Sequence, residues 1–340
     1  MNPTPARQLQ DAADSVRAPD VVFGLTHHGD RTIVTSGTAE EPAAGRENLR
    51  YEIGSVSKTF MGLLLAGLVH DGHLRYDTPV TACLPTPTGP SAPETISLVH
   101  LCTHTAGLPG MPDLRGVVGF YLSGRTTSPY ADYSRQRLLD AFHQHRGRHA
   151  PGHRWRYSNF GAAVLGHALA HTAGTCYEDL LSERVLRPLG LRHTRTAPGQ
   201  DGADAVGHRD AGTPVDHIEL NGFAPAGAVR ATPDDLLTYL EAHLCPDTTP
   251  LDAALHAVRA THTAPRPRRA PDRTLTWFCH ESRHGPIYFH GGATLGHHVY
   301  LGYRPATHTA LIGLATRRHT LRHNLVDTAH QLLAGLDQSG

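Results

Sequence analysis

Residues 51–74, YEIGSVSKTFMGLLLAGLVHDGHL, decide the interpretation of this chain, because two serines stand beside a lysine at the start of an apolar run. On a helix, residues three positions apart share a face, whereas adjacent residues diverge by about 100°. Ser55 is therefore expected to face Lys58, and Ser57 to point away. The apolar run predicts a buried helix, and Gly72 is placed to end it in a left-handed conformation.

The position of Ser55 also suits a nucleophile. Ser55 stands at the start of the predicted helix, where backbone N–H groups and the helix dipole favour developing negative charge. Gly54 precedes it and allows close backbone approach. A serine hydroxyl needs a neighbouring base to become a good nucleophile, and Lys58 has the spacing to supply one. Taken alone, S-x-x-K is common, and an N-cap serine with a solvated lysine is the simpler interpretation.

The composition indicates a soluble globular protein with neither a nucleic-acid nor a membrane partner. The 340 residues are 39% apolar and 18% charged, and Lys+Arg and Asp+Glu both total 31. No net charge therefore attracts nucleic acid or an anionic membrane. The longest apolar run, 60–69, is about half the length of a membrane span. The N-terminal segment lacks the apolar core of a secretory signal, which favours a cytoplasmic location.

Neither the cysteines nor the histidines predict a metal site. The five cysteines are scattered without a C-x-x-C pair, which favours small buried apolar thiols over disulfides. Among the 27 histidines, His100 and His104 are four apart, as are His167 and His171. Neither pair carries the glutamate of H-E-x-x-H or an evident third ligand. We expect no metal ion and no cofactor.

The order of the predicted elements places a helical insertion within one sheet. Strands are expected at 21–26, 31–36, 275–280, 286–290, 298–303 and 310–315, and helices at 6–17, 134–144, 159–172, 175–185, 231–244 and 321–335, with a loop at 246–273. Residues 1–75 and 205–340 should then form an α/β sheet subdomain, and residues 76–204 a helical one. The active site is expected in the cleft between them.

Two further motifs accompany S-x-x-K. The sequence Tyr157-Ser158-Asn159 stands just before a predicted helix, and His290-Gly291-Gly292 near the end of a predicted strand. With these motifs the chain resembles the serine β-lactamase and penicillin-binding-protein superfamily, in its branch of class C β-lactamases and family VIII carboxylesterases. There Y-x-N replaces S-D-N and H-x-G often replaces K-T-G. The resemblance covers most of the chain, through YEIGSVSKTF, LCTHTAGLP, YSNFGAAVLG, RPLGLRHT and APAGAVRATPDDLLTYL.

The resemblance implies a role for each residue of the first two motifs. Ser55 matches the nucleophile, and Lys58 its hydrogen-bonded activator. Tyr157 matches a phenol that acts as general base and then protonates the leaving group; a nearby Lys58 cation is expected to lower its pKa. Asn159 matches the amide that orients the acyl side chain and touches the lysine.

The third motif is implied to border the substrate. His290 matches the strand residue at the edge of the site, where its imidazole can share a proton with Tyr157. Gly291 and Gly292 are expected to let the strand edge approach the substrate. The backbone N–H groups of Ser55 and Ala293 would form the oxyanion hole.

The implied fold is the β-lactamase/transpeptidase-like α+β fold, with an antiparallel sheet flanked by helices and an all-helical insertion. The implied chemistry is an acyl-enzyme on Ser55, formed from a small-molecule acyl donor and resolved by an acceptor. Many β-lactamases of this class have lysine where this chain has His290. The loss of that charge for a substrate carboxylate favours neutral ester or amide donors.

The acceptor, the acyl donor and the oligomeric state are left open by the sequence. Water would make the protein an esterase or amidase, whereas an amine or alcohol would make it an ATP-independent transacylase, as in specialised-metabolite (antibiotic) biosynthesis. The alternatives are a true β-lactamase or D-amino-acid peptidase and, third, a non-catalytic ligand-binding relative. The segment 108–133 is expected to form part of the cleft wall, with four aromatic candidates for substrate contact: Phe120, Tyr121, Tyr130 and Tyr133.

Overall fold

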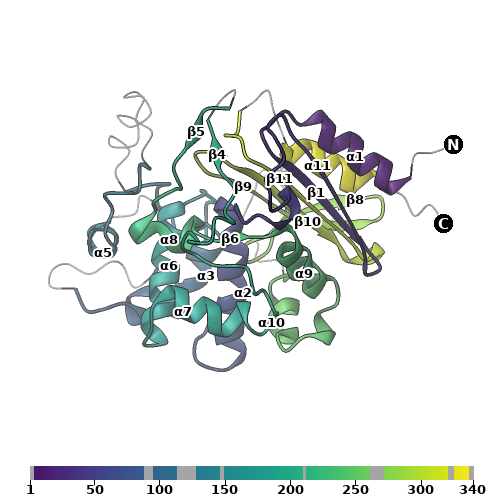
Figure 1. Ribbon diagram of the computed structural model, residues 1–340. Helices are drawn as coiled ribbons and strands as arrows, with labels where there is room; N and C mark the ends of the chain where they lie inside the picture. Colours follow the sequence, from purple (N-terminus) through teal and green to yellow (C-terminus); the bar gives the residue numbers. More distant parts are fainter. Residues whose placement is uncertain are drawn as a thin grey trace.

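A seven-stranded antiparallel sheet forms the centre of the computed structural model, which describes residues 4–87, 95–112, 128–145, 149–209, 212–260, 272–320 and 325–336 (Figure 1). The strand order is β2-β1-β11-β10-β9-β8-β7, so the first strands of the chain lie beside the last. The strands are β1 (Val21–His27), β2 (Asp30–Ser36), β7 (Asp272–Arg273), β8 (Phe278–Ser282), β9 (Gly285–Ala293), β10 (His298–Arg304) and β11 (Thr309–Ala315). The predicted antiparallel sheet is confirmed.

A hairpin joins β1 to β2, the strands predicted at 21–26 and 31–36. Its turn holds His28 and Gly29 at φ values of 51° and 93°, the left-handed pair that a two-residue hairpin turn requires. β1 continues into the centre of the sheet through its pairing with β11, in which Val21 lies opposite Ala315. The N-terminal hairpin is thereby held by the last strand of the chain.

Two terminal helices cover one face of the sheet (Figure 1). These are α1 (Pro5–Ser15) and α11 (Leu325–Gly335), whose apolar stripes share a core cluster with the sheet. Leu9 and Leu333 pack there with Phe23 and Tyr300, and all four are buried. The structure thus confirms the helix predicted at 6–17 and, from Leu325 onward, the one predicted at 321–335; residues 321–324 lie outside the described ranges.

The opposite face is covered by α9 (Pro233–Leu244), which begins as its sequence predicts: the Thr232 hydroxyl accepts a hydrogen bond from the N–H of Asp235. Beyond α9 lies α2 (Ser57–His70), which is buried on almost every side. A helix that is apolar all round belongs in a core, and α2 packs against α6, α8 and α10. It ends where predicted, with Gly72 at φ 76°.

Of the remaining elements, α6, α7, α8 and α10 pack against α2. The helices are α3 (Leu98–Cys102), α5 (Arg135–Gln144), α6 (Asn159–Thr172), α7 (Tyr177–Leu181), α8 (Ala224–Gly227) and α10 (Asp252–Ala257), and the short strands are β3 (Tyr51–Glu52) with β6 (Arg230–Ala231) and β4 (Gly207–His208) with β5 (Pro214–Val215). The prediction of a loop throughout 246–273 was wrong for α10, because Ala254 and Leu255 are buried in the core that contains α2. Within the described ranges, no helix combines the length and apolarity needed to cross a membrane.

Candidate active site

Ser55 lies in a tight turn rather than in an α-helix. Gly54–Val56 form a 3₁₀ turn that leads into α2, with Gly54 at φ 51°. Residues i and i+3 eclipse in such a turn, and Lys58 Nζ donates a hydrogen bond of 3.2 Å to Ser55 Oγ. Ser57 is turned away, and its Oγ accepts the N–H of Val229 at 3.1 Å. Of the two serines, the structure brings Ser55 to the lysine.

Lys58 is not the solvated cation of the simpler interpretation. Its side chain is 1% exposed, and Nζ also donates to the Ala226 carbonyl at 2.7 Å. Burial lowers the pKa of Lys58 to about 7, with no carboxylate among the causes to oppose it. A large fraction of the amine is therefore neutral near pH 7, with a lone pair that can accept the Ser55 proton.

Tyr157 also lies at the nucleophile, but its predicted electrostatics were wrong. Lys58 Nζ is 5.1 Å from the centre of the Tyr157 ring. Burial nevertheless raises the pKa of Tyr157, and a hydrogen bond with Ser55 only partly offsets this rise. The prediction failed because burial dominates the pKa shift of Tyr157, and Lys58 is not among the groups that shift it. Tyr157 thus stays a protonated phenol near pH 7, and its Oη is buried.

His104 holds the Tyr157 segment in place, a task that the sequence did not reveal. Its Nδ1 accepts the N–H of Ser158 at 3.3 Å, and its carbonyl accepts the N–H of Arg156 at 2.8 Å. The His104 and Tyr157 rings lie 4.5 Å apart. Both chain neighbours of Tyr157 are therefore bonded to one buried histidine, which stands in the left-handed region at φ 58°. The position of His104 within LCTHTAGLP, one of the stretches that resemble the family, was the sequence signal that could have pointed to this role.

Asn159 reaches the pocket from the first turn of α6. Ser158 caps this helix by accepting the N–H of Gly161 at 2.8 Å, which leaves Tyr157 and Asn159 on either side of the cap. Asn159 Nδ2 donates to Tyr130 Oη at 3.1 Å, and both residues line the pocket at Ser55. Of the two aromatic candidates that the structure describes, Tyr130 is placed at the nucleophile.

Tyr133, the other aromatic candidate that the structure describes, does not line this pocket. Tyr133 packs edge-on against Phe223, with ring centres 5.5 Å apart, behind the pocket wall. Phe120 and Tyr121 lie outside the described residues. Sequence position alone could not separate these side chains, because the path of the chain from 108 to 133 depends on tertiary packing.

His290 lies on β9 and is buried rather than exposed at the pocket. It is 2% exposed, and Nδ1 donates to the Gly291 carbonyl at 2.7 Å instead of sharing a proton with Tyr157. Burial and then the charge of Lys58 lower the pKa of His290 to about 3. The imidazole is neutral at physiological pH, and its ring lies 5.3 Å from that of Phe278.

The two glycines after His290 make room for other parts of the protein. A Cβ on Gly292 would lie 2.0 Å from the carbonyl oxygen of Ile53, and one on Gly291 would meet a Val326 methyl group at 3.2 Å. Their missing side chains therefore let β9 press against the nucleophile segment and α11. The sequence predicted that both glycines border the substrate, but neither is among the residues that line the pocket at Ser55.

Ala293 brings a second backbone N–H to the nucleophile. A Cβ on Gly54 would meet the Ala293 carbonyl oxygen at 2.6 Å and the Ala293 nitrogen at 2.9 Å. The backbones of the two segments are thus in direct contact, and Ser55 and Ala293 line the same pocket. This is the juxtaposition that an oxyanion hole needs.

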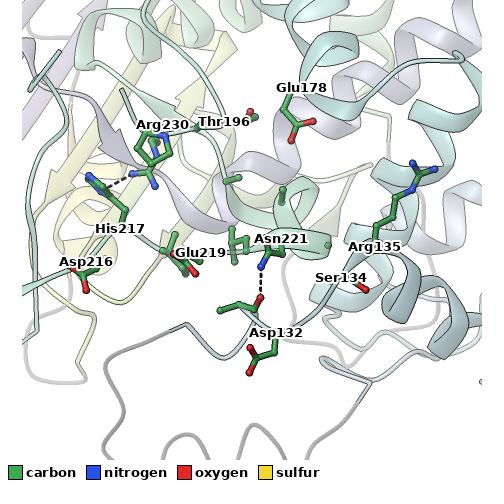
Figure 2. Close-up of a pocket in the computed structure, with 18 of the residues that line it drawn as sticks. Asp132, Ser134, Arg135, Glu178, Thr196, Asp216, His217, Glu219, Asn221 and Arg230 are labelled. Atoms are coloured by element: carbon green, nitrogen blue, oxygen red, sulfur yellow. Dashed lines mark hydrogen bonds between the residues drawn. The ribbon is translucent and has the colours of Figure 1, made fainter. Parts of the chain in front are cut away.

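The pocket at Ser55 has a neutral lining: Gly54, Ser55, Tyr130, Asn159, Ile218, Leu220, Phe223, Ala226, Gly227, Ala293 and Thr294. Ile218 and Leu220 also line a larger cleft of about 1460 Å³ (Figure 2). The described charged side chains of that cleft are four carboxylates and two guanidinium groups: Asp132, Glu178, Asp216, Glu219, Arg135 and Arg230. Arg230 is already paired with the buried Glu52 at 2.8 Å, so the cleft wall is predominantly acidic.

The histidine pairs at helical spacing serve the fold. His167 Nε2 is 2.8 Å from the Gly222 carbonyl, and His100 Nδ1 accepts the N–H of Ser97 at the start of α3. In the part of the chain that the structure describes, no three His, Cys, Asp or Glu side chains are arranged to hold a metal ion.

Comparisons with known proteins agree on one family. A family model described as Beta-lactamase matches residues 6–336. The chain is 31% identical over 220 residues to a protein named Beta-lactamase from Pseudomonas fluorescens, covering 64% of this chain and 56% of that one. It is 28% identical over 200 residues to the D-alanyl-D-alanine-carboxypeptidase/endopeptidase AmpH of Escherichia coli K12, covering 57% and 49%. The chain thus spans about half the length of these curated relatives.

A solved structure described as a class C beta-lactamase superposes with a TM-score of 0.82 at 20% sequence identity, covering 100% of this chain and 99% of that one. The predicted fold is therefore confirmed over the full length of the described molecule.

Proposed function

The chain belongs to the beta-lactamase family, and from that premise we propose that it is a serine acyl-transfer enzyme. Ser55 takes an acyl group from a neutral ester or amide and passes it to water, an amine or an alcohol. The observation that carries this proposal is the 3.2 Å contact between Ser55 Oγ and a buried lysine whose pKa is lowered to about 7.

In the proposed first half-reaction, neutral Lys58 accepts the Ser55 hydroxyl proton while Oγ attacks the carbonyl carbon. The N–H groups of Ser55 and Ala293 bind the developing oxyanion. The buried Tyr157 phenol gives its proton to the departing alcohol or amine, and Lys58 then returns the Ser55 proton to the tyrosine oxygen. In the second half-reaction, Lys58 takes the proton of the acceptor, which attacks the acyl carbon, and Ser55 Oγ recovers this proton on leaving.

Charge supports a donor without a carboxylate. The pocket lining is neutral, and His290 is buried and uncharged, so it supplies no cation for a carboxylate. The cleft that continues past Ile218 and Leu220 is predominantly acidic. Its carboxylates favour a neutral or cationic leaving group or acceptor and oppose an anionic one. A bulky amine acceptor in this cleft would make the enzyme a transacylase, as expected for a biosynthetic role.

A second candidate function is hydrolysis of β-lactams or of peptides ending in D-alanine. It is supported by relatives named Beta-lactamase and D-alanyl-D-alanine-carboxypeptidase/endopeptidase. Both substrates carry a carboxylate, so substrate charge separates the two candidates.

We expect a matched ester series to show the preference for charge. Butyryl esters of choline, of a neutral alcohol of similar size and of glycolate share one acyl group and differ in charge. The value of kcat/KM should fall by roughly tenfold or more from the cationic to the anionic ester at low ionic strength, and the difference should shrink in salt. If the glycolate ester, benzylpenicillin or a D-Ala-D-Ala peptide is turned over faster than the choline ester, the result would favour the second candidate function, hydrolysis of a substrate with a carboxylate. Addition of an amine to the choline ester reaction reports transacylation if amide replaces acid as product.

A further inference from the structure

A buried carboxylate that the proposed chemistry does not use stands three residues before the nucleophile. Glu52 lies on β3, opposite Arg230 of β6, and is 3% exposed. Burial would raise its pKa, but hydrogen bonds from His217 and His297 and the charge of Arg230 outweigh burial and hold the pKa well below its usual range. Glu52 is therefore an anion enclosed within the protein, beside the active site.

The two carboxylate oxygens contact several separate segments. Oε1 accepts from Arg230 Nη1 at 2.8 Å and from the backbone N–H of Ile218 at 2.9 Å, and it lies 3.6 Å from His217 Nδ1. Oε2 lies 3.4 Å from His297 Nδ1. Arg230 Nη1 is also 3.2 Å from His217 Nδ1, the contact drawn as a dashed line in Figure 2.

Each of these contacts reaches a wall of the Ser55 pocket. Ile218 lines both the pocket and the acidic cleft. His297 closes a turn with Thr294: the Thr294 N–H donates to the His297 carbonyl at 2.9 Å, and the His297 N–H donates to Thr294 Oγ1 at 3.2 Å. Thr294 lines the pocket next to Ala293, whose backbone lies against that of Gly54.

The fourth segment, residues 226–230, supports Lys58. Arg230 follows Ala226 and Val229 on the same short stretch, where the Ala226 carbonyl accepts Lys58 Nζ and the Val229 N–H donates to Ser57 Oγ. Hydrogen bonds to a charged group are about twice as strong as neutral ones. The Glu52 carboxylate thus connects four segments around Ser55. They are its own strand β3, the pocket wall at Ile218, the pocket wall at Ala293 and Thr294, and residues 226–230, which support Lys58.

We propose that Glu52 is a positioning residue for acyl transfer, which fixes the four segments around Ser55 in the geometry that the reaction requires. This inference rests on the proposed function, because it assigns Glu52 to the same acyl-enzyme step. Misplacement of reacting groups by about 1 Å can cost roughly 100-fold in rate. Loss of the carboxylate should therefore slow acylation at temperatures where the protein is still folded.

A purely structural ion pair is the competing explanation, and the chain contains a matched control. Arg46 Nε donates to Asp20 Oδ1 at 2.9 Å, and both residues are as deeply enclosed as Glu52 and Arg230. Asp20 also accepts from Thr316 Oγ1 at 3.0 Å, and neither member of this pair lines the pocket. Glu52→Gln removes the carboxylate paired with Arg230, and Asp20→Asn removes one of the two carboxylates paired with Arg46, whose other partner is Glu41. Loss of a buried ion pair should lower Tm in both variants.

The experiment compares Glu52→Gln with Asp20→Asn, using the rate at which an alkyl fluorophosphonate labels the active-site serine. Each variant is assayed well below its own Tm. We expect Glu52→Gln to label roughly 100-fold more slowly than wild type, with an unchanged pH midpoint near 7, because Glu52 is not among the groups that shift the pKa of Lys58. Asp20→Asn should label within about threefold of wild type despite a lower Tm.

Equal labelling rates for the two variants would overturn the inference and leave Glu52 a structural residue. If Glu52→Gln does not fold, Glu52→Asp retains the charge on a shorter side chain and should still label at least about tenfold more slowly; a wild-type rate there contradicts the proposal equally. Failure of the wild type to label would contradict the proposed function itself, whereas labelled wild type with unaffected Glu52 variants contradicts this inference alone.

Discussion

A Lys58→Met variant is expected to lose phosphonate labelling of Ser55 by roughly 100- to 10,000-fold, the usual contribution of a positioned base. Methionine fills a similar volume in the core but cannot accept the hydroxyl proton. The adjacent Thr59→Val substitution is a matched control, because Thr59 is also fully buried on α2 and its hydroxyl donates to the Val56 carbonyl. Labelling of Thr59→Val should stay near the wild-type rate.

The same Lys58→Met variant should be more stable than wild type. The fall in pKa from 10.5 to about 7 corresponds to roughly 5 kcal/mol at about 1.4 kcal/mol per unit, and the lost hydrogen bond to Ala226 offsets about 1–3 kcal/mol of it. Because the folded-state pKa lies below the unfolded one, wild type carries the full penalty below about pH 7 and loses it as pH rises toward 10.5. The stability difference should therefore shrink over that range.

Lys58 can be titrated directly, because it is the only lysine in the 340 residues. Wild-type protein labelled with [ε-¹³C]lysine should give one lysine side-chain signal that titrates near pH 7, and the labelling rate should rise tenfold per pH unit below that value and level off above it. A signal that titrates near 10.5, or a Lys58→Met variant that labels at the wild-type rate, would remove Lys58 from its role as base.

The second large effect separates the two serines. Ser55→Ala should reduce ester turnover by at least roughly 1000-fold, since the nucleophile itself is lost. Ser57→Ala should retain near wild-type turnover but lose about 1–3 kcal/mol of unfolding free energy, because the buried N–H of Val229 loses its acceptor. Turnover measured beside thermal unfolding distinguishes these outcomes. Loss of turnover in Ser57→Ala with normal Ser55→Ala turnover would reverse the assignment.

Local spacing was sufficient to predict where several elements lie. The choice between Ser55 and Ser57 followed from the three-residue spacing to Lys58, which holds in a 3₁₀ turn as well as in an α-helix. The turn at His28 and Gly29 was similarly predictable, because its backbone conformation suits few residues.

Properties that depend on burial were not predictable from the sequence. The direction of the Tyr157 pKa shift was wrong because it follows from how completely the fold encloses Tyr157. The contact of Gly292 with Ile53 was not predicted, because only the packed structure shows Ile53 at the place a side chain would occupy. Glu52 was not singled out because its partners are distant in the sequence.

The central claim is that Ser55 forms a covalent acyl-enzyme. The most direct test incubates wild-type protein with a p-nitrophenyl ester, quenches it in acid during the first turnover and measures the intact mass, followed by peptide mapping. We predict a mass increase of one acyl group on the peptide that contains residues 51–58, located on Ser55. Release of p-nitrophenol without any adduct, or an adduct located on Ser57, would contradict the claim.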